Sequence, residues 1–242
     1  MFKRIFDIFF SVLILVTSLP FLLIFSFLIW KQDFSSPFYI SKRVGKNGKE
    51  FKFFKFRSML VNADSSGINS TSSNDARITS IGRIIRKYKI DELPQLLNVF
   101  FGQMSIVGPR PNVIADVKIY TDVEKKLLSM RPGITDFSSI VFSDEGDILA
   151  DSENPDLKYN QVIRPWKSRL GLFYIEKNNL FVDTFIIFLT LIAILNKRYA
   201  LKIISIFLSY LGADNSIVEI SKRNNVLKAH NPPGSDEVVK ER

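Results

Sequence analysis

The chain has 242 residues, 46% of them hydrophobic, which suits one domain with appended segments and is too apolar for a disordered protein. Its 33 Lys and Arg residues exceed its 24 Asp and Glu residues by nine, so an anionic partner such as nucleic acid, lipid or a phosphorylated substrate is expected. It has no cysteine and one histidine, His230. Thiolate chemistry is therefore excluded and histidine triads are disfavoured, which leaves catalysis to carboxylates, hydroxyls, Lys, Arg or Tyr.

The first element along the chain is an uncharged apolar run over residues 8–30, long enough for a transmembrane helix. A single-pass anchor is one interpretation. Ser18 and Pro20 near the middle favour a bend instead, because proline removes a helix hydrogen bond and hydroxyls can satisfy the freed carbonyls. Cations flank both ends, and positive charge favours the cytoplasmic side. We therefore predict that residues 1–31 form a re-entrant membrane helix hairpin that bends at Ser18 and Pro20.

Two predicted strands, residues 39–44 and 51–56, open a small membrane-embedded α/β domain over residues 32–179. The Asn-Gly pair between them is typical of a tight hairpin. The second strand alternates aromatic and cationic residues, which suits a half-buried strand with a basic face or, less well, a single-stranded nucleic-acid surface. Because a membrane segment adjoins it, we predict no nucleic-acid partner.

A flexible loop over residues 62–74 is followed by a helix for which Thr79 is the predicted N-cap. Pro94 is tolerated in a first helical turn, so residues 93–100 are predicted to begin a new helix. Asp91 and Glu92 then lie at or just before a helix N-terminus, where backbone N–H groups favour phosphate.

The adjacent carboxylates Asp91 and Glu92 follow a run of cations that includes Arg86, and Arg110 comes later in a rigid Gly-Pro-Arg-Pro frame. A surface ion-pair network is the ordinary interpretation of such a pattern. The functional interpretation is phosphate chemistry, in which cations hold the phosphates while a carboxylate attacks or binds Mg²⁺. The candidate phosphate-binding residues are Lys55, Arg57, Arg86, Arg110 and Arg131.

The rest of the chain carries weaker signals. An amphipathic helix is predicted over residues 113–130, and the acidic stretch 143–147 lacks the ligand spacing of a calcium loop. Residues 180–212 are predicted to form interfacial amphipathic helices, although a second spanning helix over 180–196 stays open. Residues 213–242 are polar and are predicted to form a disordered tail.

Four blocks of sequence occur in the order of a known family: residues 55–59, 91–99, 104–111 and 131–135, the last two containing Gly-Pro-Arg-Pro and Arg-Pro-Gly-Ile-Thr. With these blocks, the chain resembles the bacterial sugar transferases of the small monotopic phosphoglycosyl transferase type. The resemblance covers about residues 2–194.

The resemblance implies transfer of a sugar-1-phosphate from a UDP-sugar to undecaprenyl phosphate, with release of UMP, at the start of membrane glycan assembly. It implies two steps through a covalent phospho-sugar enzyme, with Mg²⁺ as cofactor. Asp91 would be the nucleophile, and Glu92 would position Mg²⁺, Asp91 or the polyprenol phosphate, so both carboxylates are candidate metal ligands. The expected location is the cytoplasmic face of the bacterial inner membrane.

The sequence departs from the family pattern after Thr135, where Asp136 and then the acidic stretch follow. The sugar preference therefore does not follow from the resemblance, and a homodimer is an open alternative. The rival function is a non-catalytic polybasic membrane adaptor, which would need the cations but not Asp91 or Glu92.

Overall fold

The computed structural model describes residues 2–241, so residues 1 and 242, which bound the predicted membrane segment and the predicted tail, lie outside it. Its helices and strands, in chain order, are α1 (Phe2–Asp33), β1 (Phe38–Val44), β2 (Glu50–Phe56), α2 (Ser80–Lys87), α3 (Gln95–Phe100), β3 (Ser105–Val107), α4 (Ile114–Lys118), β4 (Gly133–Thr135), α5 (Phe137–Val141), α6 (Glu145–Ile148), α7 (Pro155–Lys158), α8 (Arg164–Lys177), α9 (Leu180–Leu195), α10 (Lys197–Tyr210) and α11 (Asn215–Lys222). Short helical turns join them: η1 (Lys46–Gly48), η2 (Ala63–Ser66), η3 (Ile90–Glu92), η4 (Glu124–Ser129) and η5 (Tyr159–Ile163). The predicted mixture of helices and strands is confirmed.

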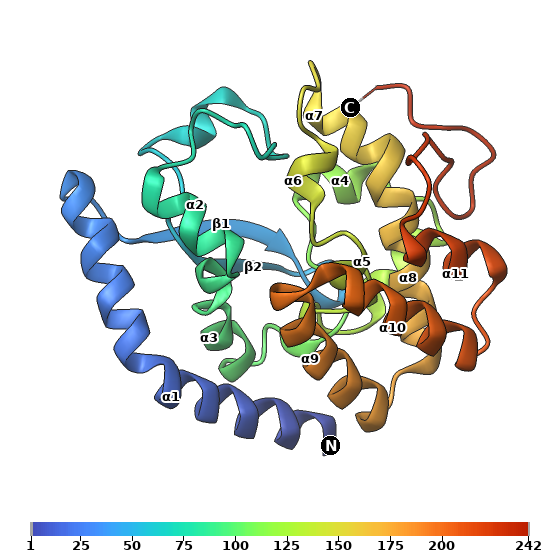
Figure 1. Cartoon of the computed structure of the whole chain (residues 1–242), viewed down its shortest axis with the longest axis horizontal. Coiled ribbons are helices and arrows are strands. Elements are labelled where there is room, and N and C mark those ends of the chain that lie inside the picture. The colour runs from blue at the N-terminus through green and yellow to red at the C-terminus, as the bar shows by residue number, and fades with distance from the viewer. Residues whose placement is uncertain (1, 242) are drawn as a thin grey trace.

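The apolar N-terminal segment forms the single helix α1, with Pro20 inside it. Figure 1 shows one helix that changes direction partway along its length, in place of the two antiparallel arms of a hairpin. Thr17 Oγ1 donates to the Leu13 carbonyl at 2.9 Å, whereas Ser18 Oγ reaches the Leu15 carbonyl only at 3.5 Å. Only 6% of the most apolar window of α1 is buried, so most of its side chains need an apolar environment outside the protein.

Both ends of α1 are attached to the same domain. Near its start, Arg4 donates to the Val99 carbonyl at 2.6 Å and to the Phe100 carbonyl at 2.8 Å, which satisfies free carbonyls at the end of α3. At its end, the Asp33 carboxylate accepts from the Arg57 guanidinium, with Nη2 to Oδ1 at 2.7 Å. The middle of the helix therefore projects between two fixed points.

The predicted hairpin is confirmed, since β1 and β2 pair antiparallel with Val44 opposite Glu50. The buried Asn98 of α3 joins this hairpin to the helix that follows the candidate carboxylates. Its Oδ1 accepts from the Phe54 amide at 3.0 Å, and its Nδ2 donates to the Lys52 carbonyl at 2.6 Å. The predicted N-cap is also confirmed, because Thr79 Oγ1 accepts from the Gly82 amide at 2.9 Å.

The Gly-Pro-Arg-Pro and Arg-Pro-Gly-Ile-Thr blocks lie side by side, because β3 and β4 pair in parallel. The Gly133 amide donates to the Pro109 carbonyl at 3.0 Å, and the Gly108 amide donates to the Thr135 carbonyl at 3.0 Å. A Cβ on Gly133 would lie 2.1 Å from the Gly108 nitrogen, so glycine is needed for this close backbone approach. These contacts fix the backbone immediately before Arg110.

The main core lies among α5, α8, α9 and α10, with β2 and β3 at its edge (Figure 1). The predicted helix over residues 113–130 is wrong. The short α4 and the 3₁₀ turn η4 replace it, because Glu124 turns inward to meet the fully buried Arg164 of α8 at 3.2 Å. Helices α9 and α10 pack against each other, and both also carry apolar residues that are exposed on the surface. Their contact with a membrane stays a prediction.

The structure also differs from the predicted disordered tail. Helix α11 buries Ile217, and the segment after it packs on α8 and η5. The Arg169 guanidinium donates to the Asn231 carbonyl at 2.9 Å, and Gln161 Nε2 donates to the Val239 carbonyl at 2.8 Å. The amino-acid composition of the tail does not predict this docking. The contacts are made largely by backbone carbonyls, which every residue type has.

Candidate active site

Asp91 and Glu92 lie on the 3₁₀ turn η3, just before α3, as expected from Pro94. Lys89, the residue just before the turn, has a left-handed backbone with a φ of 58°. A non-glycine residue in this region costs of the order of 1 kcal/mol or more and persists only where neighbouring structure holds it. Both carboxylates are buried, with Asp91 4% and Glu92 9% exposed, so an ordinary solvated ion-pair network is excluded.

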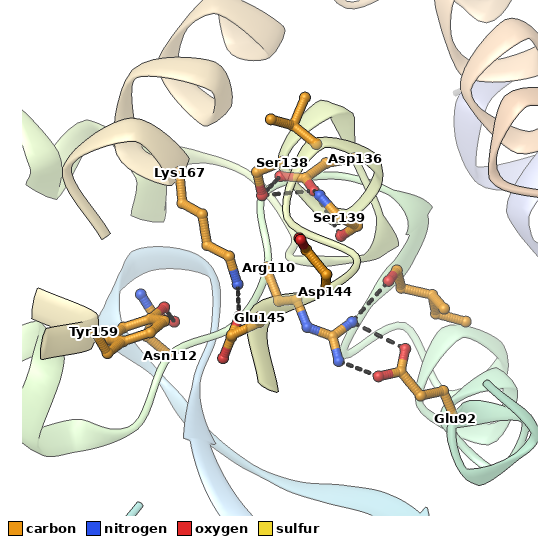
Figure 2. A network of polar contacts seen from close by, with 12 residues as sticks. Glu92, Arg110, Asn112, Asp136, Ser138, Ser139, Asp144, Glu145, Tyr159 and Lys167 are labelled. Carbon is orange, nitrogen blue, oxygen red and sulfur yellow. Dashed lines mark hydrogen bonds and ion pairs between the residues drawn. The ribbon is translucent and has the colours of Figure 1, made fainter. Parts of the chain in front are cut away.

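Two of the predicted phosphate-binding residues meet Glu92 (Figure 2 draws the Arg110 pair). Arg110 Nη1 donates to Glu92 Oε2 at 3.0 Å, Nη2 contacts Oε1, and Nη1 also donates to the Ile134 carbonyl at 2.9 Å. Lys55 Nζ donates to Glu92 Oε1 at 3.1 Å. The two-pronged contact holds the Arg110 fork in one plane, and both Glu92 oxygens are occupied.

Asp91 is bound much less tightly. Its Oδ2 lies 3.6 Å from Lys55 Nζ, and its buried Oδ1 accepts no hydrogen bond from any residue that the structure describes. A buried acceptor without a donor is rare in native proteins and carries a desolvation cost. This orphaned oxygen is free to bind a cation or to attack an electrophile.

The charges around Glu92 decide its protonation. Burial by itself would raise the pKa of Glu92, but Arg110, Lys55 and Lys89 outweigh it and hold that pKa well below its usual value of 4.5. For Lys55 burial is the larger effect: it lowers the pKa of the ammonium group, and the opposing charges of Glu92 and Asp91 only reduce this shift. Glu92 is therefore ionised at neutral pH and orients the two cations.

The structure does not bring the other predicted cations into contact with the two carboxylates. Arg57 is 9% exposed and joins β2 to the end of α1. Arg86 reaches Ser58 Oγ at 3.4 Å, and Arg131 donates through Nε to the Gly102 carbonyl at 2.8 Å. Their role in phosphate binding stays a prediction, and Arg57 has an evident structural task.

Sequence reasoning missed several residues around Arg110. Glu145 and Asp136 both act electrostatically on the Arg110 guanidinium, and Lys167 of α8 contacts Glu145. The signal was the acidic stretch 143–147, which was compared only with a calcium loop. Its position next to an arginine could not be read from spacing along the chain.

The residues present fit one magnesium ion only in part. The described residues contain no group of three or more His, Cys, Asp or Glu side chains that could hold a metal. Mg²⁺ in phosphate enzymes commonly takes one or two carboxylates, with substrate phosphate oxygens completing its shell. The free Oδ1 of Asp91 meets that need, whereas Glu92 would first have to release Arg110 or Lys55.

An apolar cavity of about 410 Å³ lies between α1, the start of β1 and the start of α3. It is lined by Leu15, Val16, Leu19, Leu22, Leu23, Ser26, Phe38, Pro94 and Leu97. Pro94 is two residues beyond Glu92. An apolar ligand in this cavity would therefore lie close to the charged site.

The chain is similar in sequence to known proteins over most of its length. The family model described as "Bacterial sugar transferase" matches residues 1–197. The exopolysaccharide production protein ExoY of Sinorhizobium fredii is 33% identical over 81% of this chain and 86% of its own length.

Two longer relatives carry names that state a reaction. The UDP-glucose:undecaprenyl-phosphate glucose-1-phosphate transferase of Klebsiella pneumoniae is 34% identical over 78% of this chain, but only 39% of its own length is covered. The UDP-N-acetylgalactosamine-undecaprenyl-phosphate N-acetylgalactosaminephosphotransferase of Aeromonas hydrophila is 30% identical over 80% of this chain and 43% of its own length. Since the family model covers most of the chain, the protein belongs to the bacterial sugar transferases.

Proposed function

We propose that this protein transfers a sugar-1-phosphate from a UDP-sugar to undecaprenyl phosphate and so initiates the assembly of a membrane-linked glycan. The observation that carries the proposal is the orphaned Asp91 oxygen beside the Glu92–Arg110–Lys55 cluster. A nucleophile needs a free lone pair, and a diphosphate substrate needs fixed cations. Here Asp91 and Glu92, the carboxylate that holds the cations Arg110 and Lys55, are neighbours on one buried turn.

In the first step, an Asp91 carboxylate oxygen attacks the phosphorus that carries the sugar. The bond from that phosphorus to the bridging oxygen breaks, and UMP leaves with the electron pair. Arg110 stabilises the negative charge that develops on the phosphoryl oxygens, because Glu92 already holds its guanidinium in position. Lys55, which contacts both carboxylates, shields Asp91 from the charge of the diphosphate.

In the second step, a phosphate oxygen of the polyprenol acceptor attacks the same phosphorus. The bond to the Asp91 oxygen breaks, and its electron pair returns to the carboxylate. The product is a sugar linked to polyprenol through a diphosphate. Splitting the transfer into two displacements allows a water-soluble donor and a membrane acceptor to use one site in turn.

We place Mg²⁺ beside Asp91, where substrate phosphate oxygens would complete its shell. When bound, the ion would neutralise diphosphate charge that repels the carboxylate nucleophile. Glu92 would act mainly by positioning Arg110 and Lys55, since its two oxygens already accept from them.

The two anchors of α1 support a re-entrant placement. Lys3 and Arg4 near its start and Asp33 at its end contact the same domain. A spanning helix separates its ends by about 30 Å of hydrocarbon, which would force part of the domain across the bilayer. A bent helix that enters one leaflet and returns avoids this, and it puts the domain on the inner membrane's cytoplasmic face, which flanking cations favour.

The cavity beside α1 suits the isoprenoid part of the acceptor. Its lining is aliphatic and aromatic apart from Ser26, and it includes Pro94, two residues beyond Glu92. A chain seated there would bring its phosphate to Lys55 and Asp91 at headgroup depth. The polybasic adaptor has no use for a buried carboxylate with an unsatisfied oxygen.

The test is release of UMP by the purified protein from a panel of UDP-sugars, with Mg²⁺ and undecaprenyl phosphate. The two-step route also predicts a phospho-sugar adduct on Asp91 when the acceptor is omitted, detectable by mass spectrometry. An adduct on another side chain would overturn the role of Asp91. Absence of UMP release with every UDP-sugar would overturn the function.

A further inference from the structure

The acidic stretch of residues 143–147 lies beside the candidate active site (Figure 2). It belongs to the part of the chain that departs from the family pattern after Thr135. Its two neighbouring acids, Asp144 and Glu145, have different partners.

Asp144 attaches the stretch to the C-terminal helices. Arg223 at the end of α11 donates to Asp144 Oδ2 at 3.1 Å, and Lys197 at the start of α10 also contacts Oδ2. On the other side of the stretch, the Ser73 amide donates to the Gly146 carbonyl at 2.9 Å. With contacts before and after it, the backbone of Glu145 is held in place.

Glu145 instead faces the active site. Its Oε2 accepts from Lys167 Nζ of α8, and the pair lies on the other side of Arg110 from Glu92 in Figure 2. The side chains of Glu145 and Lys167 are 33% and 14% exposed. Burial by itself would raise the pKa of Glu145, but Lys167, Arg110 and Lys89 together lower it. Lys89 also lowers the pKa of Glu92, so Glu145 and Glu92 lie in the electrostatic field of the same cations.

The pair is suited to hydroxyl recognition. No hydrogen bond joins Glu145 Oε1 to a residue that the structure describes, so this oxygen can accept from a sugar hydroxyl. The Lys167 ammonium has three donors, of which Glu145 takes one. Ionic groups in a partly closed site are costly to retain for stability alone.

We propose that Glu145 and Lys167 bind hydroxyl groups of the donor sugar and thereby set which sugar this protein transfers. This inference rests on the proposed function. The sugar oxygen is bonded directly to the phosphorus that Asp91 would attack, so the sugar must lie next to Arg110. The departing UMP is joined to the same phosphorus through the bridging oxygen and lies on the side opposite to the attacking Asp91 oxygen.

The experiment pairs the variant Glu145→Gln with altered substrates. The best UDP-hexose is compared with its 3-, 4- and 6-deoxy analogues, and kcat/KM is measured for wild type and variant. We expect the variant to lose about 10- to 100-fold with the complete sugar. With the analogue that lacks the contacted hydroxyl, it should lose less than about 3-fold, because the two changes remove the same contact. Inhibition by UDP, which lacks the donor hexose, should not change.

Two controls separate recognition from structure. Asp147→Asn makes the same charge change at an exposed position of the same stretch, and it should leave the order of sugar preference unaltered. The exchange Glu145→Lys with Lys167→Glu keeps an ion pair between α6 and α8. It should retain the thermal stability of wild type but not its sugar preference. Lys167→Met is a second single variant in case Glu145→Gln folds poorly.

An equal loss for the hexose and all its deoxy analogues would overturn the proposal in favour of a purely structural pair. So would a charge exchange that restores the wild-type sugar preference. Weaker inhibition by UDP in Glu145→Gln would assign the pair to the nucleotide instead. Failure of the proposed function is a different result, since wild type itself would then release no UMP.

Discussion

Two arginine–glutamate pairs in this protein have the same chemistry and different surroundings. Glu124 and Arg164 join η4 to α8, with side chains 0% and 1% exposed. The second oxygen of Glu124 accepts from Ser168 Oγ at 2.7 Å. Glu92 and Arg110 keep 11% and 23% of their side-chain surface exposed.

The difference lies in what adjoins each pair. Both oxygens of Glu124 accept from neighbouring residues, so this carboxylate joins two elements, although Arg164 Nε and Nη2 are buried without an acceptor among the described residues. Glu92 adjoins Asp91, which has a buried oxygen without a donor. Such an unsatisfied group costs stability, and its retention beside a fixed, partly exposed arginine is typical of a functional site.

The sharpest test of this comparison is Asp91→Asn. Loss of the nucleophile should lower UMP release by about 10³-fold or more. The melting temperature should stay the same or rise, because the variant removes a buried carboxylate that is poorly paired. Both are measured on purified protein, with Asp122→Asn as a matched change at an exposed position. A large loss of stability would mean that Asp91 is a structural residue like Glu124.

The opposite outcome is expected for Glu124→Ala. It leaves Arg164 buried without its partner and should lower the free energy of unfolding by about 3–5 kcal/mol. Specific activity of the folded fraction should change by less than about 2-fold, because no group near Asp91 is altered. Denaturant unfolding and the UMP assay give the two quantities. If this variant were as stable as wild type, the purely structural role of the Glu124–Arg164 pair would be contradicted.

Arg110→Lys should have an intermediate effect. A lysine keeps the charge but cannot contact both Glu92 oxygens and a phosphate from one plane. We expect kcat/KM to fall about 10- to 100-fold with little change in melting temperature. The control is Arg83→Lys on the exposed face of α2. Unchanged kinetics would show that Arg110 only pairs with Glu92.

The smallest effect concerns pH. Because the pKa of Glu92 lies below its usual 4.5, its ionised form stabilises the fold above that pH, and the contribution is lost as pH falls through the lowered pKa. The melting-temperature difference between wild type and Glu92→Gln should be constant above about pH 5 and shrink below 4.5. A difference that grows on acidification would contradict the direction of the shift.

Local rules predicted the local parts of the fold. The Thr79 cap, the Asn-Gly hairpin and the helix after Pro94 depend on neighbouring residues, and all are present. The helix predicted over residues 113–130 failed because a distant partner, Arg164, draws Glu124 inward. The prediction of a disordered tail failed for a related reason. The backbone carbonyls of the tail accept hydrogen bonds from α8 and η5, and such contacts cannot be predicted from the residue types of the tail.

For the candidate site, the sequence determined the family, the two carboxylates and the cations available to them, because these are carried by contiguous blocks. The tertiary structure decided which cations arrive: Arg110 and Lys55 reach Glu92 across 18 and 37 positions, whereas Arg57 is used to hold α1. It also decided that Asp91 keeps a free oxygen and that Glu145, paired with Lys167, acts electrostatically on Arg110. The physical reason is that such pairings depend on the path of the backbone and on the desolvation it imposes, and neither is encoded within a short stretch of chain.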